Sequence, residues 1–290
     1  MNFNFTEDQL DLMNMIKKFT EKEIAPRAGE YDETDQFPEE LFNQIVEMGL
    51  TSIGIDECYG GPGGTDLDRV LAIREIGKKD GSLATLVSVS SMMIHALEDF
   101  GTEEQRKKYL TLMAQDGYKT AFALTEPGAG SDPSGLKTTA KFDERTNEYI
   151  LNGNKTFITG GARADLTVVF AMTDASLGAK GISAFIVEKS RKGFSTGKPE
   201  KKMGIRASET VDLFFDDCRI PKENLLGREG EGFKIAMKVL DGSRIGIGAV
   251  ALGIAEGAFE EAVKYSKQRV QFGKPICANQ GIQWYIAEMA

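Results

Sequence analysis

Hydrophobic residues over the first part of the chain repeat with the spacing of helices. An imperfect apolar face is formed by Leu10, Met13, Ile16 and Phe19. Residues typical of helix ends punctuate this part: capping pairs at Thr6 with Gln9 and at Thr102 with Gln105, a proline suited to a first helical position at Pro38, and helix stops at Gly29 and Gly49. Residues 1–115 are therefore predicted to form an all-helical N-terminal domain.

The hydrophobic period changes from helical spacing to alternation at about Tyr118. Strands are predicted at residues 120–124, 149–151, 167–172, 182–188 and 211–215, with Gly, Asn and Asp turns between them. The pair Asn152-Gly153 predicts a tight hairpin between residues 149–151 and 155–159. Because no helices separate these strands, residues 116–230 are expected to form a middle β domain, an antiparallel barrel or sandwich.

Helical composition returns after the glycine-containing segment 227–232. One long helix is predicted at residues 231–268, with Gly242 and Gly257 as positions where it could break, and part of a second helix from Asn279. Residues 231–290 would form the first part of a C-terminal helical bundle, and the fold class is multidomain α+β. Because these helices cannot close a bundle without partners, we expect a C-terminally incomplete chain, either a fragment or the product of a truncated gene.

Composition excludes several classes of function. The 290 residues carry 44 Asp and Glu against 35 Lys and Arg, with no sustained basic run, so no nucleic-acid partner is expected. No apolar stretch reaches the roughly 18–20 residues that span a bilayer, and no signal peptide is recognisable, so we expect a cytoplasmic protein without a membrane partner. Cys58, Cys218 and Cys277 form no Cys-x-x-Cys pair and are expected to be buried or half-buried, and with His95 as the only histidine no metal site is expected.

Residues 121–132, AFALTEPGAGSD, form the most informative stretch of the chain. An apolar strand breaks here into a loop of small residues, which lets the backbone approach a ligand closely and lets successive N–H groups cradle phosphate oxygens. For the glycine pattern alone, a strand followed by a Pro-Gly turn is an equally good interpretation. A second pattern, GIGAVA at residues 246–251, matches a dinucleotide motif, but its helical surroundings favour a small-residue face for helix packing.

Segments further along the chain favour the ligand-binding interpretation. They are FITGG at residues 157–161, DGSR at 241–244, RVQFGKPI at 269–276 and Gln280. In this order and at these spacings they resemble the acyl-CoA dehydrogenase family of flavoenzymes, especially its short-chain, butyryl-CoA-type members. The resemblance runs over residues 5–290 and implies FAD as the cofactor.

The resemblance also implies which residues bind FAD. The flavin and its pyrophosphate would be lined by Phe122, Ala123, Leu124, Thr125, Gly128, Gly130 and Ser131. The ring would be covered by Phe157, where many members have Trp, by Ile158 and by Thr159, with Thr125 bonded to the pyrimidine side and the Thr159 hydroxyl near N5. The diphosphate and adenine end of a cofactor held mainly by a neighbouring subunit would meet Arg269, Phe272 and Gln280, which implies a homodimer or homotetramer.

Acyl-CoA substrate, by the same resemblance, would contact Ser131, Asp241, Gly242, Ser243 and Arg244. Glu126 is expected to hold the loop and not to act as a base. From the residues alone, Thr125 and Thr159 could equally be ordinary strand threonines, and Asp241 with Arg244 a surface pair on a helix.

The implied reaction is α,β-desaturation of a short-chain acyl-CoA, or the reverse reduction of an enoyl-CoA, with electrons exchanged with an electron-transfer flavoprotein, as in fatty acid β-oxidation. The family's catalytic glutamate would lie beyond Ala290, so no catalytic residue is assigned. We therefore expect the 290-residue chain alone to bind FAD weakly and to lack dehydrogenase activity. The alternatives are an acyl-CoA oxidase-like flavoenzyme and a non-catalytic flavin- or CoA-binding module.

Overall fold

The computed structural model describes residues 4–290. Its N-terminal part is helical, with α1 (Glu7–Phe19), a π-helical turn (Thr20–Ile24), α2 (Ala28–Thr34), α3 (Glu39–Glu47), α4 (Asp66–Gly77), α5 (Gly81–Phe100) and α6 (Glu103–Gln115). The capping boxes that begin at Thr6 and Thr102 are confirmed, and Thr65 begins a third at α4. Short 3-10 turns lie at Glu57–Tyr59, Pro133–Gly135, Ala175–Gly181, Lys222–Asn224 and Ile276–Ala278.

Two predicted boundaries of the N-terminal helices are wrong. Gly29 lies inside α2, whose end is set by Asp35 in the left-handed region with φ 56°. Pro38 is the residue before α3 and not its first helical residue. Gly49, in contrast, does follow the end of α3, and its φ of 73° is one that glycine adopts without strain.

The middle part of the chain forms one sheet. Its strands are β1 (Thr120–Ala123), β2 (Thr139–Asp143), β3 (Glu148–Thr159), β4 (Leu166–Met172), β5 (Ile182–Glu188), β6 (Phe194–Thr196), β7 (Thr210–Pro221) and β8 (Leu225–Leu226). The order is β6-β7-β3-β2-β4-β5-β8, and β1 also pairs with β4. The sheet is mixed and not purely antiparallel, because β1 and β2 both run parallel to β4.

The predicted hairpin at Asn152-Gly153 is wrong, because β3 continues straight through both residues. The Asn152 side chain exchanges hydrogen bonds with Asp217, at an irregularity where β7 carries one more residue than β3. Gly153 is required for a different reason, since a Cβ there would lie 2.6 Å from the Thr138 hydroxyl. The Asn-Gly pair therefore serves the pairing of three strands and not a turn.

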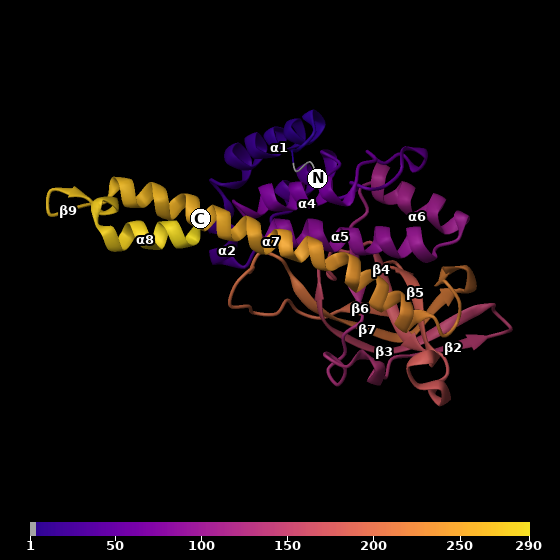
Figure 1. The fold of residues 1–290 in the computed structure, drawn as a ribbon. Coiled ribbons are helices and arrows are strands. Elements are labelled where there is room, and N and C mark those ends of the chain that lie inside the picture. Colours follow the sequence, from indigo (N-terminus) through magenta and orange to yellow (C-terminus); the bar gives the residue numbers. More distant parts are fainter. Residues whose placement is uncertain (1–3) are drawn as a thin grey trace.

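The C-terminal part is dominated by α7 (Gly232–Gln268), which continues unbroken through Gly242 and Gly257. It is followed by a hairpin of β9 (Val270–Gln271) and β10 (Lys274–Pro275) and by α8 (Gln280–Met289). Figure 1 shows α7 running past α5 and α4, with α8 folding back beside it, so that the β9 hairpin projects from the end of the molecule away from the sheet.

Glycines on α7 explain how closely this helix packs. A Cβ at Gly246 would lie 2.6 Å from the Ser88 hydroxyl of α5, one at Gly253 2.5 Å from a carbonyl oxygen of α4, and one at Gly257 2.1 Å from the carbonyl of Lys78. Gly248 is different, since nothing lies within 4 Å of its Cβ position. The GIGAVA segment is thus part of a helix-packing face, as predicted for its first glycine, and not a strand-to-helix dinucleotide loop.

Three apolar clusters hold these elements together. One lies between the sheet and helices α5, α6 and α7, a second among α1, α3, α4, α5 and α7, and a third on the opposite face of the sheet. Cys218 is buried in the third cluster and Cys277 is half-buried, as predicted, but Cys58 is exposed in the turn Glu57–Tyr59. In the part of the chain that is described, none of the helices combines the length and apolar character needed to cross a membrane.

Candidate functional site

The loop of residues 125–131, here called the glycine loop, leaves the end of β1 and lies against β3. The backbone N–H of Thr156 donates to the Thr125 carbonyl at 2.9 Å. Within the loop, Glu126 and Ala129 exchange backbone hydrogen bonds of 3.1 and 3.0 Å. The structure therefore brings the two segments with the strongest sequence signals, the glycine loop and residues 157–159, to one end of the sheet.

Glu126 anchors the glycine loop through its side chain. Its Oε1 lies 2.7 Å from the Nζ of Lys155, and its carboxylate accepts backbone N–H groups of Lys137 at 2.6 Å and Thr138 at 3.0 Å. Burial raises the pKa of the Glu126 carboxyl, but the Lys155 ammonium and these hydrogen bonds lower it more, so the net pKa lies below the usual range. An ionised, fully engaged carboxylate has the structural role predicted for it.

No steric contact within this chain requires glycine at positions 128 and 130. Nothing lies within 4 Å of a Cβ built on Gly128, and only the Thr125 methyl, at 4.0 Å, approaches one built on Gly130. Both residues are exposed, and neither has a positive φ. Space beside an exposed backbone is what close approach of a phosphate to main-chain N–H groups requires.

Phe157 is the most unusual residue of β3. Between the pairs Lys155–Leu213 and Ile158–Val211, two residues of β3 oppose one of β7, and Phe157 lies in this bulge with φ 57°. Its ring is 64% exposed, although both sequence neighbours are buried. A non-glycine residue held in the left-handed region costs about 1–3 kcal/mol, and such residues cluster at functional sites. No residue type in this segment predicts the left-handed backbone conformation.

The other predicted flavin residues divide into two groups. Thr125 and Thr159 are half-buried, Ser131 is exposed, and Phe122 is half-buried with its ring 4.9 Å from that of Phe170. The side chains of Ala123, Leu124 and Ile158 belong to the apolar core. Those three could meet a ligand only through their main-chain groups.

The DGSR segment lies on α7, where Asp241 and Arg244 form an ion pair of 3.5 Å with both side chains more than three-quarters exposed. The surface pair considered from the sequence is therefore present. Gly242 faces His95 of α5, because a Cβ there would lie 3.1 Å from His95 Nδ1. His95 Nε2 lies 2.7 Å from the Arg69 guanidinium and 3.3 Å from Asp66 Oδ1.

Arg269, Phe272 and Gln280 lie at the opposite end of the molecule from the sheet (Figure 1). Phe272 stands at the tip of the β9–β10 hairpin with its ring 98% exposed. The structure therefore does not bring these three residues together with the glycine loop of the same chain.

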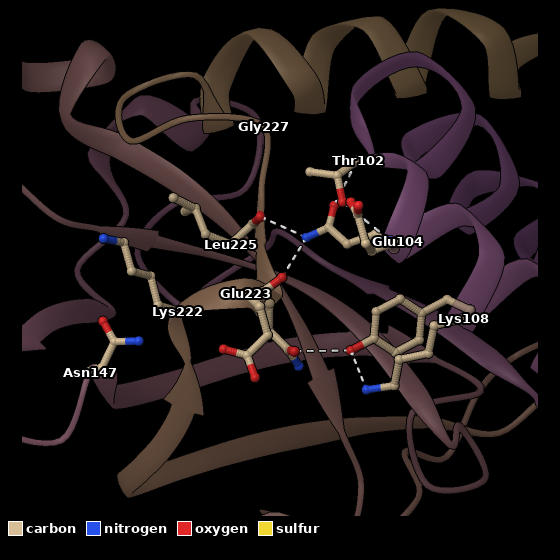
Figure 2. A pocket seen from close by; sticks show the side chains of 11 residues that line it. Thr102, Glu104, Lys108, Asn147, Lys222, Glu223, Leu225 and Gly227 are labelled. Carbon is tan, nitrogen blue, oxygen red and sulfur yellow. Dashed lines mark hydrogen bonds between the residues drawn. The ribbon is translucent and has the colours of Figure 1, made fainter.

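A cavity of about 520 Å³ lies elsewhere, between α6 and the segment that follows β7 (Figure 2). Its polar groups bond to one another: Gln105 Nε2 donates to the carbonyls of Glu223 and Leu225 at 2.7 and 2.8 Å, and the Tyr109 hydroxyl donates to Asn224 at 3.0 Å. None of the residues predicted to bind FAD or acyl-CoA lines it. This cavity belongs to the seam between the helical part and the sheet.

Comparison with known proteins defines the class to which this fold and site belong. Three family models match the chain: the acyl-CoA dehydrogenase N-terminal domain over residues 6–116, the middle domain over 121–218 and the C-terminal domain over 230–290. The chain belongs to the acyl-CoA dehydrogenase family of oxidoreductases. The family and the fold class predicted from the sequence are thereby confirmed.

Three individual relatives are similar to this chain over nearly its whole length. Acryloyl-CoA reductase (NADH) from Anaerotignum propionicum is 53% identical over all of this chain and 74% of its own length. The solved butyryl-CoA dehydrogenase from Megasphaera elsdenii has a TM-score of 0.96 at 46% identity, over 100% of this chain and 76% of that one. A chain solved in work on the electron transferring flavoprotein of Acidaminococcus fermentans has a TM-score of 0.96 at 49% identity, over 99% and 76%.

Proposed function

We propose that this chain binds FAD and a short-chain acyl-CoA, and that it serves the α,β-desaturation of the acyl-CoA or the reverse reduction of an enoyl-CoA. The observation that carries the proposal is the hydrogen bond from the Thr156 N–H to the Thr125 carbonyl, which joins the glycine loop to the strand that carries the strained, exposed Phe157. The bound FAD would supply hydride chemistry. Two relatives, a butyryl-CoA dehydrogenase and an acryloyl-CoA reductase, are named for opposite directions of this reaction, which supports both directions.

The residues present fit this cofactor. Backbone N–H groups near Gly128 and Gly130, with the Ser131 hydroxyl, would bind its phosphates, while the Thr125 and Thr159 side chains would bond to its ring. The Phe157 ring would shield one face from water. The proposed domains are residues 1–115, 116–230 and 231–290. No residue of the chain is proposed as the catalytic base.

A second copy of the chain is part of the proposal. Arg269, Phe272 and Gln280 belong to the β9 hairpin and its junctions with α7 and α8, which project away from the sheet (Figure 1), so they would meet the cofactor of a second copy. A partner subunit's Arg269 would supply a planar guanidinium for the diphosphate. FAD affinity should therefore rise with protein concentration, because dimer formation and cofactor binding are linked.

FAD titration of the purified protein tests the proposal without turnover. We expect the flavin absorption spectrum to shift on binding and to shift again on addition of butyryl-CoA. Folded protein that leaves the FAD spectrum unchanged at every concentration would overturn the proposal. A second measurement starts from the photoreduced protein. Electron transfer to an electron-transfer flavoprotein indicates a dehydrogenase, and peroxide formation in air indicates an oxidase-like enzyme. A protein that binds FAD and butyryl-CoA but reduces neither the flavoprotein nor dioxygen is better described as a binding module.

Replacing Phe157 should separate stability from binding. In Phe157→Gly the left-handed backbone is no longer strained, so the free energy of unfolding without FAD is expected to stay level or rise by up to about 1 kcal/mol. Loss of the ring should weaken FAD binding about 10-fold, since a stacked aromatic contributes about 0.5–1.5 kcal/mol. Urea unfolding and FAD fluorescence measure the two quantities. Phe157→Trp is the control that should retain binding, and tight binding by the glycine variant would contradict the ring-cover role.

Arg244→Ala should weaken butyryl-CoA binding to the FAD-loaded protein by about 10-fold, because a charged hydrogen bond to the CoA carrier is lost. The free energy of unfolding should change by less than about 0.5 kcal/mol, since the pair with Asp241 is exposed. Lys264→Ala is a matched control, because Lys264 pairs with Glu261 at 3.3 Å on the same helix and is similarly exposed. Calorimetric titrations that give the two variants equal affinities would remove Arg244 from the substrate site.

A further inference from the structure

Lys155 is a buried, charged residue that was not among the residues predicted to bind FAD or acyl-CoA. Its side chain is fully buried in β3, yet its ammonium reaches the glycine loop, with Nζ 2.7 Å from Glu126 Oε1 and 3.2 Å from the Leu124 carbonyl. The residues that it contacts flank Thr125 on both sides. The next residue of β3, Thr156, donates its N–H to the carbonyl of Thr125 itself. Three consecutive residues, 124–126, are thus tied to two consecutive residues of β3.

We propose that Lys155 is a positioning residue that sets the glycine loop against the Phe157 bulge and thereby prepares the FAD site. The inference rests on the proposed function. Phe157 lies two residues beyond Lys155 in the same strand, so one side chain fixes the spacing between the two surfaces that would contact the flavin. Lys155 itself would touch neither FAD nor substrate.

A stabilising role alone explains this lysine poorly. Burying an ammonium and a carboxylate removes both from water, and a buried ion pair is often no more stabilising than apolar residues of similar volume. The pair instead fixes the position of the glycine loop relative to β3, because its hydrogen bonds can be satisfied in only one arrangement of the two segments. The neighbouring strand β7 also carries a carboxylate, Asp212, but it accepts a hydrogen bond from the Thr156 hydroxyl at 2.5 Å. The ion pair of Lys155 is with Glu126.

The pKa of Lys155 predicts how FAD affinity should depend on pH. Burial lowers the pKa of Lys155 to about 8, although the attraction of Glu126 acts in the opposite direction. Both side chains are therefore charged at neutral pH, and the ammonium is lost as the pH rises above about 8. If the ion pair positions the loop, FAD affinity should fall over this range.

The test compares FAD dissociation constants and melting temperatures of three proteins. Lys155→Met, which keeps the length and burial of the side chain, should weaken FAD binding roughly 10- to 100-fold, the range found when residues that orient metal ligands are replaced. It should also abolish the fall in affinity above about pH 8 that the unchanged protein shows. Lys78→Met is the matched control, since Lys78 is largely buried at the end of α4 and pairs with Glu75 at 2.9 Å and Glu256 at 3.3 Å, with no contact to the glycine loop among its ion pairs; it should lower the melting temperature and leave FAD binding unchanged.

Each outcome decides the inference. Failure of the unchanged protein to bind FAD would overturn the proposed function, whereas FAD binding that is equal in the unchanged protein and Lys155→Met would overturn only the role of Lys155. If Lys155→Met does not fold, the pH dependence of FAD binding by the unchanged protein and by Glu126→Gln remains decisive. Affinity that stays constant from pH 7 to about pH 9 in the unchanged protein would exclude the positioning role.

Discussion

Gly130→Val is expected to weaken FAD binding strongly while leaving the chain as stable as before. The new side chain would enter the open space beside the glycine loop, where only the Thr125 methyl lies as near as 4.0 Å, and no positive φ opposes it. The free energy of unfolding should therefore change by less than about 0.5 kcal/mol. If a phosphate needs that space, the methyl groups should weaken FAD binding by roughly 100-fold, equivalent to about 2.7 kcal/mol.

The measurement pairs urea unfolding without cofactor with FAD titration of the folded protein. Gly29→Val is the control, because Gly29 is also exposed, also has nothing within 4 Å of its Cβ position, and lies in α2 of the helical part. It should leave FAD affinity unchanged. Normal binding by Gly130→Val would show that the open space beside the loop is not where the phosphates lie, and the loop would revert to an ordinary Pro-Gly turn.

Local sequence signals predicted most of the fold because the physical forces behind them are local. The capping pairs at Thr6 and Thr102 each close hydrogen bonds within four residues, and both are found where they were predicted. Strand β5 coincides with the predicted residues 182–188, since its apolar run is bounded by turns on both sides. The signal at Asn152-Gly153 failed because contacts with Thr138 and Asp217, distant in sequence, determined the conformation there.

The candidate site was predictable in part for the same reason. The glycine loop is a contiguous motif and could be seen in the sequence, and the structure shows that its neighbour in space is β3. The left-handed conformation of Phe157 depends on a bulge in the pairing of β3 with β7, which no residue type in the segment specifies. Lys155 was missed because a single lysine in an alternating strand pattern is read as a solvent-facing residue. Its carboxylate partner lies 29 positions earlier.

Gly257→Ala is expected to destabilise the chain, against the direction of helix propensity. Alanine in place of glycine inside a helix normally stabilises it by about 1 kcal/mol. At position 257 the added methyl would lie 2.1 Å from the Lys78 carbonyl at the end of α4, so α7 and α4 would have to move apart. Overpacking of this kind costs about 1–3 kcal/mol, and the loss of contact along the α4–α7 seam places the expected net change near the upper end of that range.

Gly248→Ala on the same helix should do the opposite. Nothing lies within 4 Å of its Cβ position and the residue is exposed, so only the propensity gain of about 1 kcal/mol remains. The two variants add the same methyl to the same helix, and urea unfolding should give them free-energy changes of opposite sign. If both variants stabilise the chain, α7 does not need glycine at position 257 to approach α4. The two helices would then have room for the added methyl group.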